Sequence, residues 1–493
     1  MRFRIASSAA WLIAMIVASG CGDSAGDGNP GSESGTSKSG TSGAGTSGSG
    51  SGASTGGVNA SGSSGSSASG STGSGTGASG SSAGATAGSS ASGTSGSTAG
   101  GSSGSGASGT GSTTGSTSGS TSGGSGVGSG DAGTSGATVG DAGGCNPEFA
   151  SGVNVAWFTF AGDVPNPNMT SFNGLYSNIY PVGGRVVRWW FHTDGMTTPG
   201  YDSTGLAKPI SAANIADVKK ILDAAVAAGE SVNISLWSFG MLDSRQASDA
   251  TVLANNKLLL TTTANRNAYV TNVLTPLVTA LKGHPGIYSW EIFNEPEGMI
   301  DDGPNPSGPW QTGGAFVGIK DIQTTVNVFA SAIHGADPAA KVTNGAWTFI
   351  AVGGEHGQSG TNYYSDAALK TAGGMANGTL DYYEVHYYDN WGTVGQADPV
   401  SPFIYTASSW NLDKPIVMGE FWAVGSPELD GGTIAANSLY TTLYSNGYKG
   451  AWAWQYANSD NPGPASGAPT EWPAMQAPMQ ALETAHATDL QCR

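Results

Sequence analysis

Two kinds of apolar pattern alternate along the chain from residue 145 to its end. Short runs rich in β-branched and aromatic residues, typical of buried strands, are separated by longer stretches whose apolar residues recur at helical spacing. We expect eight strands, at residues 152–158, 184–191, 231–237, 287–293, 341–347, 380–388, 415–421 and 450–455.

Ser211 and Gly229 mark the two ends of the clearest helix. Serine caps a helix because its side chain accepts a backbone N–H, and glycine ends one because it adopts the left-handed conformation. The apolar face between them is Ile215, Val218, Ile221, Leu222 and Val226. Segments 264–281, 316–334 and 434–444 have similar patterns, so we expect helices there as well.

The alternation of strands with helices predicts parallel strands, because parallel neighbours need a crossover connection. Eight such units close into a (β/α)₈ barrel, which is the α/β architecture that we expect for residues 145–493. The alternative is an open, doubly wound sheet. A nucleotide-binding sheet of that kind is disfavoured, because no Gly-rich phosphate loop follows the first expected strand.

The N-terminus has the pattern of an export signal. Arg2 and Arg4 precede a short apolar run, and this run ends in small residues directly before Cys21. A run of this length is too short for a transmembrane helix. Small residues before a Cys resemble a bacterial lipoprotein signal, so we predict a signal at 1–21 and lipidation of Cys21. The alternative is an ordinary cleaved signal peptide.

Residues 22–144 consist almost only of Gly, Ser, Ala and Thr, and they hold most of the 80 Gly of the chain. Such a segment cannot bury enough apolar surface to offset its chain entropy. We therefore expect a disordered linker, with a span on the order of 60 Å.

Two of the three Cys residues, Cys145 and Cys492, bracket the expected folded domain. Export implies an oxidising compartment, in which disulfides persist. The first and last strands of a closed barrel are neighbours, so the two ends of the domain can meet. We predict a disulfide between Cys145 and Cys492, with two free thiols as the alternative.

The formal net charge of −17 argues against nucleic acid or an anionic membrane surface as a partner. We expect a monomer whose membrane contact is through the lipid at Cys21. The six His residues are scattered, with no His-Glu-x-x-His pattern and no Cys cluster. We therefore expect no metal and no other cofactor.

Two glutamates stand at the carboxyl ends of expected strands, where barrel enzymes place their catalytic groups. Glu295 follows the fourth strand and Glu420 ends the seventh. Glycoside hydrolysis needs one carboxyl group that protonates the leaving oxygen and, in a retaining enzyme, a second that attacks the sugar. Glu295 and Glu420 are therefore our candidate catalytic residues.

The run Asn294-Glu295-Pro296, followed on a later strand by Glu420, resembles clan A of the glycoside hydrolases. The similarity is greatest to family 5, the family of cellulases and mannanases, and it covers residues 152–456. It implies a retaining hydrolase of a β-1,4-linked polysaccharide, with Glu295 as the acid/base and Glu420 as the nucleophile.

The resemblance also implies supporting roles for residues on other strands. Arg188 matches the Arg that contacts the nucleophile, and Asn294 matches the Asn that binds the sugar 2-hydroxyl. His386 and Tyr388 match the His-x-Tyr of the sixth strand. Trp454 matches the Trp beneath the sugar at the −1 subsite, where the reacting anomeric carbon lies.

The third expected strand departs from the family pattern, because it ends in Trp237-Ser238-Phe239 where family 5 usually has a His. His192, after the second strand, is our candidate substitute, and Trp237 is a candidate substrate contact. Tryptophan offers a broad flat face for a sugar ring. Others near expected strand ends are Trp189, Trp190, Trp310, Trp347, Trp391 and Trp422. We expect about half of these to pack in the core and the rest to line an extended cleft.

Three further glutamates lie close to the candidate pair in the sequence. Glu291 and Glu384 sit deeper on their strands, and we expect both to be buried supporting groups. Glu297 follows Pro296, and we expect it in a loop at the barrel mouth.

We favour endo-β-1,4-mannanase activity, because the Trp-Ser-Phe strand end resembles mannanase-like members of the family. Endo-β-1,4-glucanase activity is the nearest alternative. A non-catalytic carbohydrate-binding surface protein is an alternative of another class, and transglycosylation would use the same catalytic groups.

Overall fold

The computed structural model describes most of the chain from residue 145 onward. The described segments are 145–303, 314–388, 400–422, 434–456 and 471–492. The expected signal at 1–21 with Cys21, the expected linker at 22–144, and Trp310 and Trp391 lie outside the described residues.

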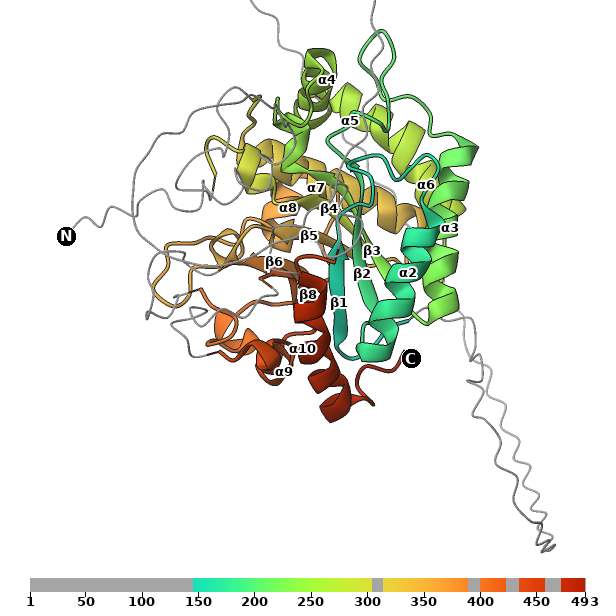
Figure 1. Ribbon diagram of the computed structural model, residues 1–493. Helices are drawn as coiled ribbons and strands as arrows, with labels where there is room; N and C mark the ends of the chain where they lie inside the picture. Colours follow the sequence, from blue (N-terminus) through green and yellow to red (C-terminus); the bar gives the residue numbers. More distant parts are fainter. Residues whose placement is uncertain (1–144, 304–313, 389–399, 423–433, 457–470, 493) are drawn as a thin grey trace, which may run out of the picture. The chain divides into compact units, whose positions relative to one another are not determined.

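Eight parallel strands close into a barrel in which each strand pairs with the next and β8 pairs with β1. The strands are β1 (Ala150–Val155), β2 (Val186–Thr193), β3 (Ser231–Ser238), β4 (Ile287–Asn294), β5 (Val342–Ala346), β6 (Tyr383–Tyr387), β7 (Ile416–Phe421) and β8 (Gly450–Ala453). Figure 1 shows the strands in the interior with helices around them. The (β/α)₈ fold is confirmed, and each expected strand is present with bounds that differ by a few residues.

Helices occupy most of the crossovers between strands. They are α2 (Met169–Ile179), α3 (Ala212–Ala228), α4 (Ala250–Thr261), α5 (Thr263–Tyr269), α6 (Thr275–Ala280), α7 (Ile319–Ala336), α8 (Asp366–Gly373), α9 (Leu439–Ser445) and α10 (Glu471–His486). Between β6 and β7 the described residues contain only the 3₁₀ helix η6 (Ala407–Trp410). No helix in the described segments has the length and apolarity that a membrane span requires.

The expected helix between Ser211 and Gly229 is α3. The Ser211 hydroxyl accepts the Asn214 N–H at 3.0 Å, and Gly229 ends the helix with a φ of 85°. The segment expected as one helix at 264–281 is divided into α5, a π-helical turn (Val270–Leu274) and α6. The other two expected helices begin later than predicted, at Ile319 and Leu439.

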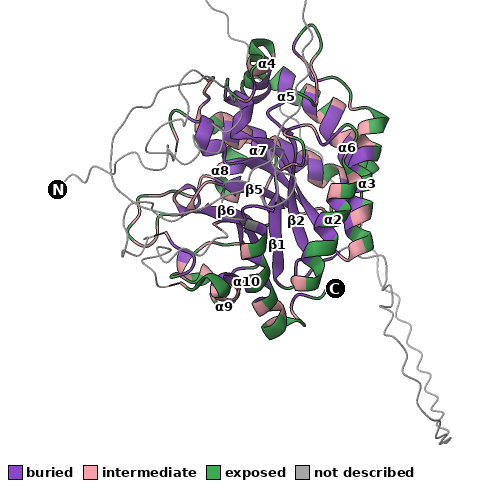
Figure 2. Cartoon of the chain, viewed as in Figure 1, coloured by how far each residue is buried: buried purple, intermediate pink, exposed green. Residues whose placement is uncertain are grey.

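The barrel interior is built in layers, because alternate residues of a strand point to the same face. On β2, Val186 belongs to an apolar layer, Arg188 to a charged layer and Trp190 to an aromatic layer. The apolar layer also contains Ala150, Tyr382, Val417 and Trp452. The opposite faces of the strands pack against the helices, and the strands are buried along nearly their whole length (Figure 2).

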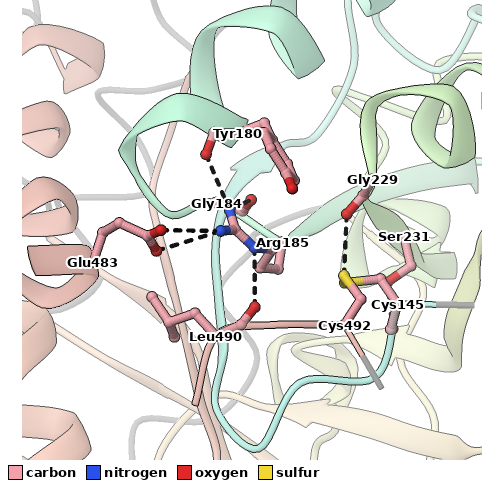
Figure 3. Close-up of a disulfide and its surroundings, with 9 residues drawn as sticks. All are labelled: Cys145, Tyr180, Gly184, Arg185, Gly229, Ser231, Glu483, Leu490 and Cys492. Carbon is pink, nitrogen blue, oxygen red and sulfur yellow. Dashed lines mark hydrogen bonds and ion pairs between the residues drawn. A yellow bond between two sulfur atoms is a disulfide. The ribbon is translucent and has the colours of Figure 1, made fainter. Parts of the chain in front are cut away.

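The two ends of the described domain meet below the amino-terminal ends of β2 and β3 (Figure 3). The sulfur atoms of Cys145 and Cys492 are bonded, with their Cα atoms 4.3 Å apart. Ser231 donates to the Cys145 carbonyl at 3.1 Å, and Arg185 Nε donates to the Leu490 carbonyl at 2.9 Å. These bonds attach both ends to the barrel at the pole opposite the strand carboxyl ends.

Candidate active site

The two candidate carboxylates lie at the carboxyl ends of β4 and β7 and are almost completely buried. Glu295 directly follows β4 and is 5 % exposed, and Glu420 lies within β7 and is 4 % exposed. His386 on β6 lies between them, with Nδ1 at 2.8 Å from Glu295 Oε1 and 3.6 Å from Glu420 Oε1. One oxygen of each carboxyl group and a ring nitrogen of His386 lie within 4.8 Å of one another.

The backbone at Glu295 turns sharply into the barrel. Its φ of 47° and ψ of 55° lie in the left-handed region, which a non-glycine residue occupies at a cost of about 1–3 kcal/mol. The Glu295 N–H donates to the Gly345 carbonyl at 2.8 Å and so holds the turn against β5. This conformation directs a residue that follows the strand toward its partner across the mouth.

Both oxygens of Glu420 accept a strong hydrogen bond. Arg188 Nη1 donates to Oε1 at 2.6 Å, and the Tyr388 hydroxyl donates to Oε2 at 2.7 Å. Bonds of this kind favour the ionised form of a carboxyl group. They also fix the orientation of the carboxylate.

The surroundings of the two carboxyl groups separate their acidities. Burial raises the pKa of Glu295 well above its usual range, and the charge of Glu420 raises it further. Burial also raises the pKa of Glu420, but Arg188 and the Tyr388 hydroxyl counteract that rise. Glu420 therefore ionises first while Glu295 keeps its proton. A nucleophile must be ionised and a general acid must be protonated, so these states suit the two expected roles.

His386 is uncharged in this site. Burial lowers its pKa well below the usual range, and the positive charge of Arg188 lowers it further. A neutral imidazole can form a hydrogen bond with Glu295 without forming an ion pair that would remove the Glu295 proton.

Arg188 holds the charged layer together from a fully buried position. Nε and Nη2 donate to Glu291 at 2.7 and 2.6 Å. Nη1 also donates to Asn154 at 2.9 Å, and Nη2 also donates to Asn294 at 2.7 Å. The planar guanidinium thus links β1, β2, β4 and β7 and sets the positions of their side chains.

Two groups of buried side chains, Glu291–Glu384–His386 and Glu295–His386–Glu420, have the spacing of a metal site within the described segments. Both share His386. The guanidinium of Arg188 contacts Glu291, Glu384 and Glu420, so it already supplies a cation to these carboxyl groups. The arrangement fits an ion-pair network.

An aromatic layer lies at the carboxyl ends of the strands, and one of its members, Tyr388, donates a hydrogen bond to Glu420. It consists of Trp157, Trp190, Tyr388, Trp422 and Trp454. The rings of Trp190 and Trp454 lie 5.6 Å apart, and Trp157 meets Trp190 edge-on at 5.3 Å. Trp157 was not singled out from the sequence, and the structure places it just after β1, which ends at Val155.

The family model described as Cellulase (glycosyl hydrolase family 5) matches residues 150–460. The chain belongs to glycosyl hydrolase family 5. It is therefore a glycosidase, and the expected family is confirmed.

Two relatives of this family 5 enzyme bear the name mannan endo-1,4-beta-mannosidase. The protein from Cryptopygus antarcticus is 33% identical over 326 residues, which cover 62% of this chain and 80% of the relative. The protein from Mytilus edulis is 33% identical over 321 residues, which cover 62% of this chain and 83% of the relative. The solved beta-mannanase structure from Mytilus edulis has a TM-score of 0.59 and 29% identity, and the match covers 69% of this chain and 96% of that one.

Most of the site residues expected of a family 5 enzyme lie together around the carboxylates. Arg188, Asn294, His386 and Tyr388 are joined to the pair directly or through Arg188 by the bonds described above. Trp454 lies beside them in the aromatic layer and is followed by a cis peptide bond.

Trp237 does not lie with the carboxylates of the family 5 site. Its side chain is 1 % exposed and packs against His192 and Tyr269. The next residue, Ser238, faces the site instead, because its hydroxyl accepts a hydrogen bond from Asn294 at 3.3 Å. The prediction that Trp237 contacts substrate is therefore wrong, since its ring has no free face for a sugar.

His192 does not substitute for the His that the third strand lacks. It is fully buried between Phe191 and Trp237, and its Nδ1 lies 2.8 Å from the Thr198 hydroxyl. Burial lowers its pKa to about 3. None of its described contacts reaches Glu295 or Glu420.

The remaining acids of the region are all buried. Glu291 and Glu384 lie in the charged layer, as expected. Glu297, which we expected in a loop at the mouth, is instead completely buried in the 3₁₀ helix Pro296–Met299. Its carboxylate accepts the Trp347 N–H at 3.0 Å and the Tyr364 hydroxyl at 2.5 Å, so it anchors the segment that follows Glu295.

Proposed function

We propose that this enzyme cleaves β-1,4-linked mannan within the chain and with net retention of anomeric configuration. The observation that carries the proposal is the approach of Glu295 and Glu420 oxygens to within 4.8 Å. Retaining glycosidases hold their two carboxyl groups about 5–5.5 Å apart, whereas inverting enzymes need about 6.5–9.5 Å. Both relatives named above carry an endo-mannanase name, and this supports mannan as the substrate.

In the first step, the carboxyl proton of Glu295 moves to the glycosidic oxygen while Glu420 attacks the anomeric carbon. The bond from that carbon to the leaving oxygen breaks, and a glycosyl ester forms on Glu420. In the second step, the Glu295 carboxylate takes a proton from water. The water oxygen attacks the same carbon, and the Glu420 carboxylate leaves.

The neighbours of the pair support this exchange of roles. Arg188 and Tyr388 keep Glu420 ionised before it reacts. Formation of the ester removes the Glu420 charge that raises the pKa of Glu295, so that pKa falls and Glu295 becomes a base. We assign the sugar 2-hydroxyl to Asn294 and the face of the −1 sugar to Trp454.

The family description, Cellulase, supports endo-β-1,4-glucanase activity as a second candidate. Glucan and mannan differ in the configuration of the sugar 2-hydroxyl, which the proposed Asn294 contact would meet. The same chemistry on a glucan chain would leave every assignment in the catalytic pair unchanged.

The test is reducing-sugar release by the purified protein on mannan, glucomannan, carboxymethyl cellulose and xylan. Mannan should be the best substrate. Glu295→Gln and Glu420→Gln should each lower kcat by at least about 100-fold, since each removes a group that acts in the transition state. Proton NMR should show that the first-formed product keeps the β configuration. An inverted first product would refute the double displacement.

We also propose that the enzyme is exported and held at a bacterial cell surface by a lipid on Cys21. The signal pattern at 1–21 and the Gly/Ser-rich segment at 22–144 support this arrangement. The Cys145–Cys492 pairing supports export to an oxidising compartment. Labelled palmitate should be incorporated into the parent and lost in Cys21→Ser. A labelled Cys21→Ser chain would exclude this anchor, and gel filtration of that variant should show a monomer.

A further inference from the structure

Glu384 is a fully buried acid of the charged layer for which the mechanism above has no use. It lies on β6 two residues before His386, and its Oε1 is 2.8 Å from Arg188 Nε. Gly419 on β7 leaves the space for it, because a Cβ at that position would lie 2.4 Å from Glu384 Oε1. The fold thus makes room for a carboxyl group directly behind the catalytic pair.

The guanidinium of Arg188 has no N–H left for this carboxyl group. It carries five N–H donors. Glu291 accepts two of them, and Asn154, Asn294 and Glu420 each accept one. The single hydrogen on Nε points to Glu291, and neither oxygen of Glu384 receives a hydrogen bond from the described residues.

The charges around Glu384 also disfavour its ionisation. Titratable groups from four strands face it. They are Arg188 on β2, Tyr288 and Glu291 on β4, His386 on β6 with Tyr382 directly before that strand, and Glu420 on β7. One guanidinium is shared among three buried carboxyl groups, those of Glu291, Glu384 and Glu420. A third buried carboxylate without donors would meet a large desolvation cost.

We propose that Glu384 is a positioning residue that carries a proton in the resting enzyme. Its neutral carboxyl group donates a hydrogen bond to Glu291 and leaves the charge of Arg188 to Glu291 and Glu420. The kinetic part of this inference rests on the proposed glycosidase mechanism. Burial and the charge of Glu291 raise the pKa of Glu384 well above its usual range, which agrees with the donor count.

The kinetic test compares three variants by the pH profile of kcat/KM on mannan. Glu384→Ala should lower kcat/KM by about tenfold or more, because it removes the group that orients Glu291 and Arg188. Glu384→Gln, which resembles the protonated acid, should restore most of that loss and keep the acid limb of the parent. Glu291→Gln is the matched control, and its acid limb should fall by about one pH unit because a charge that raises the pKa of Glu420 is lost.

The proposal is overturned if Glu384→Gln moves the acid limb as Glu291→Gln does, since Glu384 would then be ionised in the parent. It is equally overturned if Glu384→Gln is as impaired as Glu384→Ala.

Infrared difference spectra give a readout that needs no activity. Near neutral pH the parent should show the carbonyl stretch of a protonated buried carboxyl group that is absent from Glu384→Gln and present in Glu295→Gln. Identical parent and Glu384→Gln spectra would refute the proposal. An inactive parent that shows this band would refute the mannanase assignment and leave the protonated Glu384 standing.

Discussion

Tyr388→Phe isolates one hydrogen bond to Glu420, the proposed nucleophile. The substitution removes the hydroxyl that donates to Glu420 Oε2 at 2.7 Å, while the ring that packs beside Trp422 remains. A hydrogen bond to a charged group contributes about 1.5–3 kcal/mol. Because one pKa unit corresponds to about 1.4 kcal/mol, the pKa of Glu420 should rise by about one to two units.

Glu420 can attack the sugar only in its ionised form, and this fixes the direction in which the pH profile moves. The lost donor stabilised the ionised carboxylate, so Glu420 stays protonated up to a higher pH in the variant. The acid limb of kcat/KM against pH should move upward by about one unit, since Tyr388 is partly exposed and the lower end of the range applies. At one unit below the parent limb, the rate should fall by about tenfold.

Tyr440→Phe is the matched control. Its hydroxyl donates to the Gly152 carbonyl at 2.8 Å on the outside of the barrel and contacts none of the carboxylates. It should lower the free energy of unfolding by about 1 kcal/mol and leave the pH profile in place. An acid limb of Tyr388→Phe that coincides with that of the parent would refute the idea that this hydroxyl keeps Glu420 ionised.

Three further outcomes are expected. Replacing Cys145 and Cys492 together with Ser should lower the free energy of guanidinium unfolding by about 2–4 kcal/mol, and equal stability of the variant and the oxidised parent would refute the role of the disulfide. His192 has a folded pKa of about 3, below its unfolded value, so it stabilises the fold above about pH 6.5 and this stability is lost as the pH falls toward 3. The free energy of unfolding in urea should therefore fall less between pH 7 and pH 4 for His192→Asn than for the parent, by on the order of 3 kcal/mol. Trp454→Ala should lower kcat/KM on mannan by at least about tenfold, whereas Trp237→Phe, which alters a ring buried away from the carboxylates, should leave substrate affinity in place.

The sequence was enough to predict the barrel, and it singled out Glu295 and Glu420, which the structure brings together at the carboxyl ends of β4 and β7. Strands buried on both faces appear as short apolar runs, and the alternation with helices leaves few architectures open. Glu295 and Glu420 were identified because the ends of barrel strands are few and carboxyl groups are rare there. The role expected of Arg188 came from the resemblance to family 5.

The orientation of Trp237 and the burial of Glu297 could not be predicted, because each depends on irregular backbone at a strand end. Pairings between β2 and β3 and between β4 and β5 shift register near the mouth, so strict alternation of side chains fails there. The protonation that we propose for Glu384 could not be predicted from the sequence either. It depends on how five N–H groups of Arg188 are shared among side chains from several strands.

The disulfide between Cys145 and Cys492 has a practical consequence for immobilising this enzyme. Both residues are fixed below the amino-terminal ends of β2 and β3, whereas Glu295 and Glu420 occupy the carboxyl ends of β4 and β7. A bead or fusion partner coupled just before Cys145 or just after Cys492 would therefore join the domain at the pole that the polymer does not use. Coupling through loops at the other pole would obstruct the proposed catalytic groups, so the two attachment schemes should differ sharply in activity on long chains.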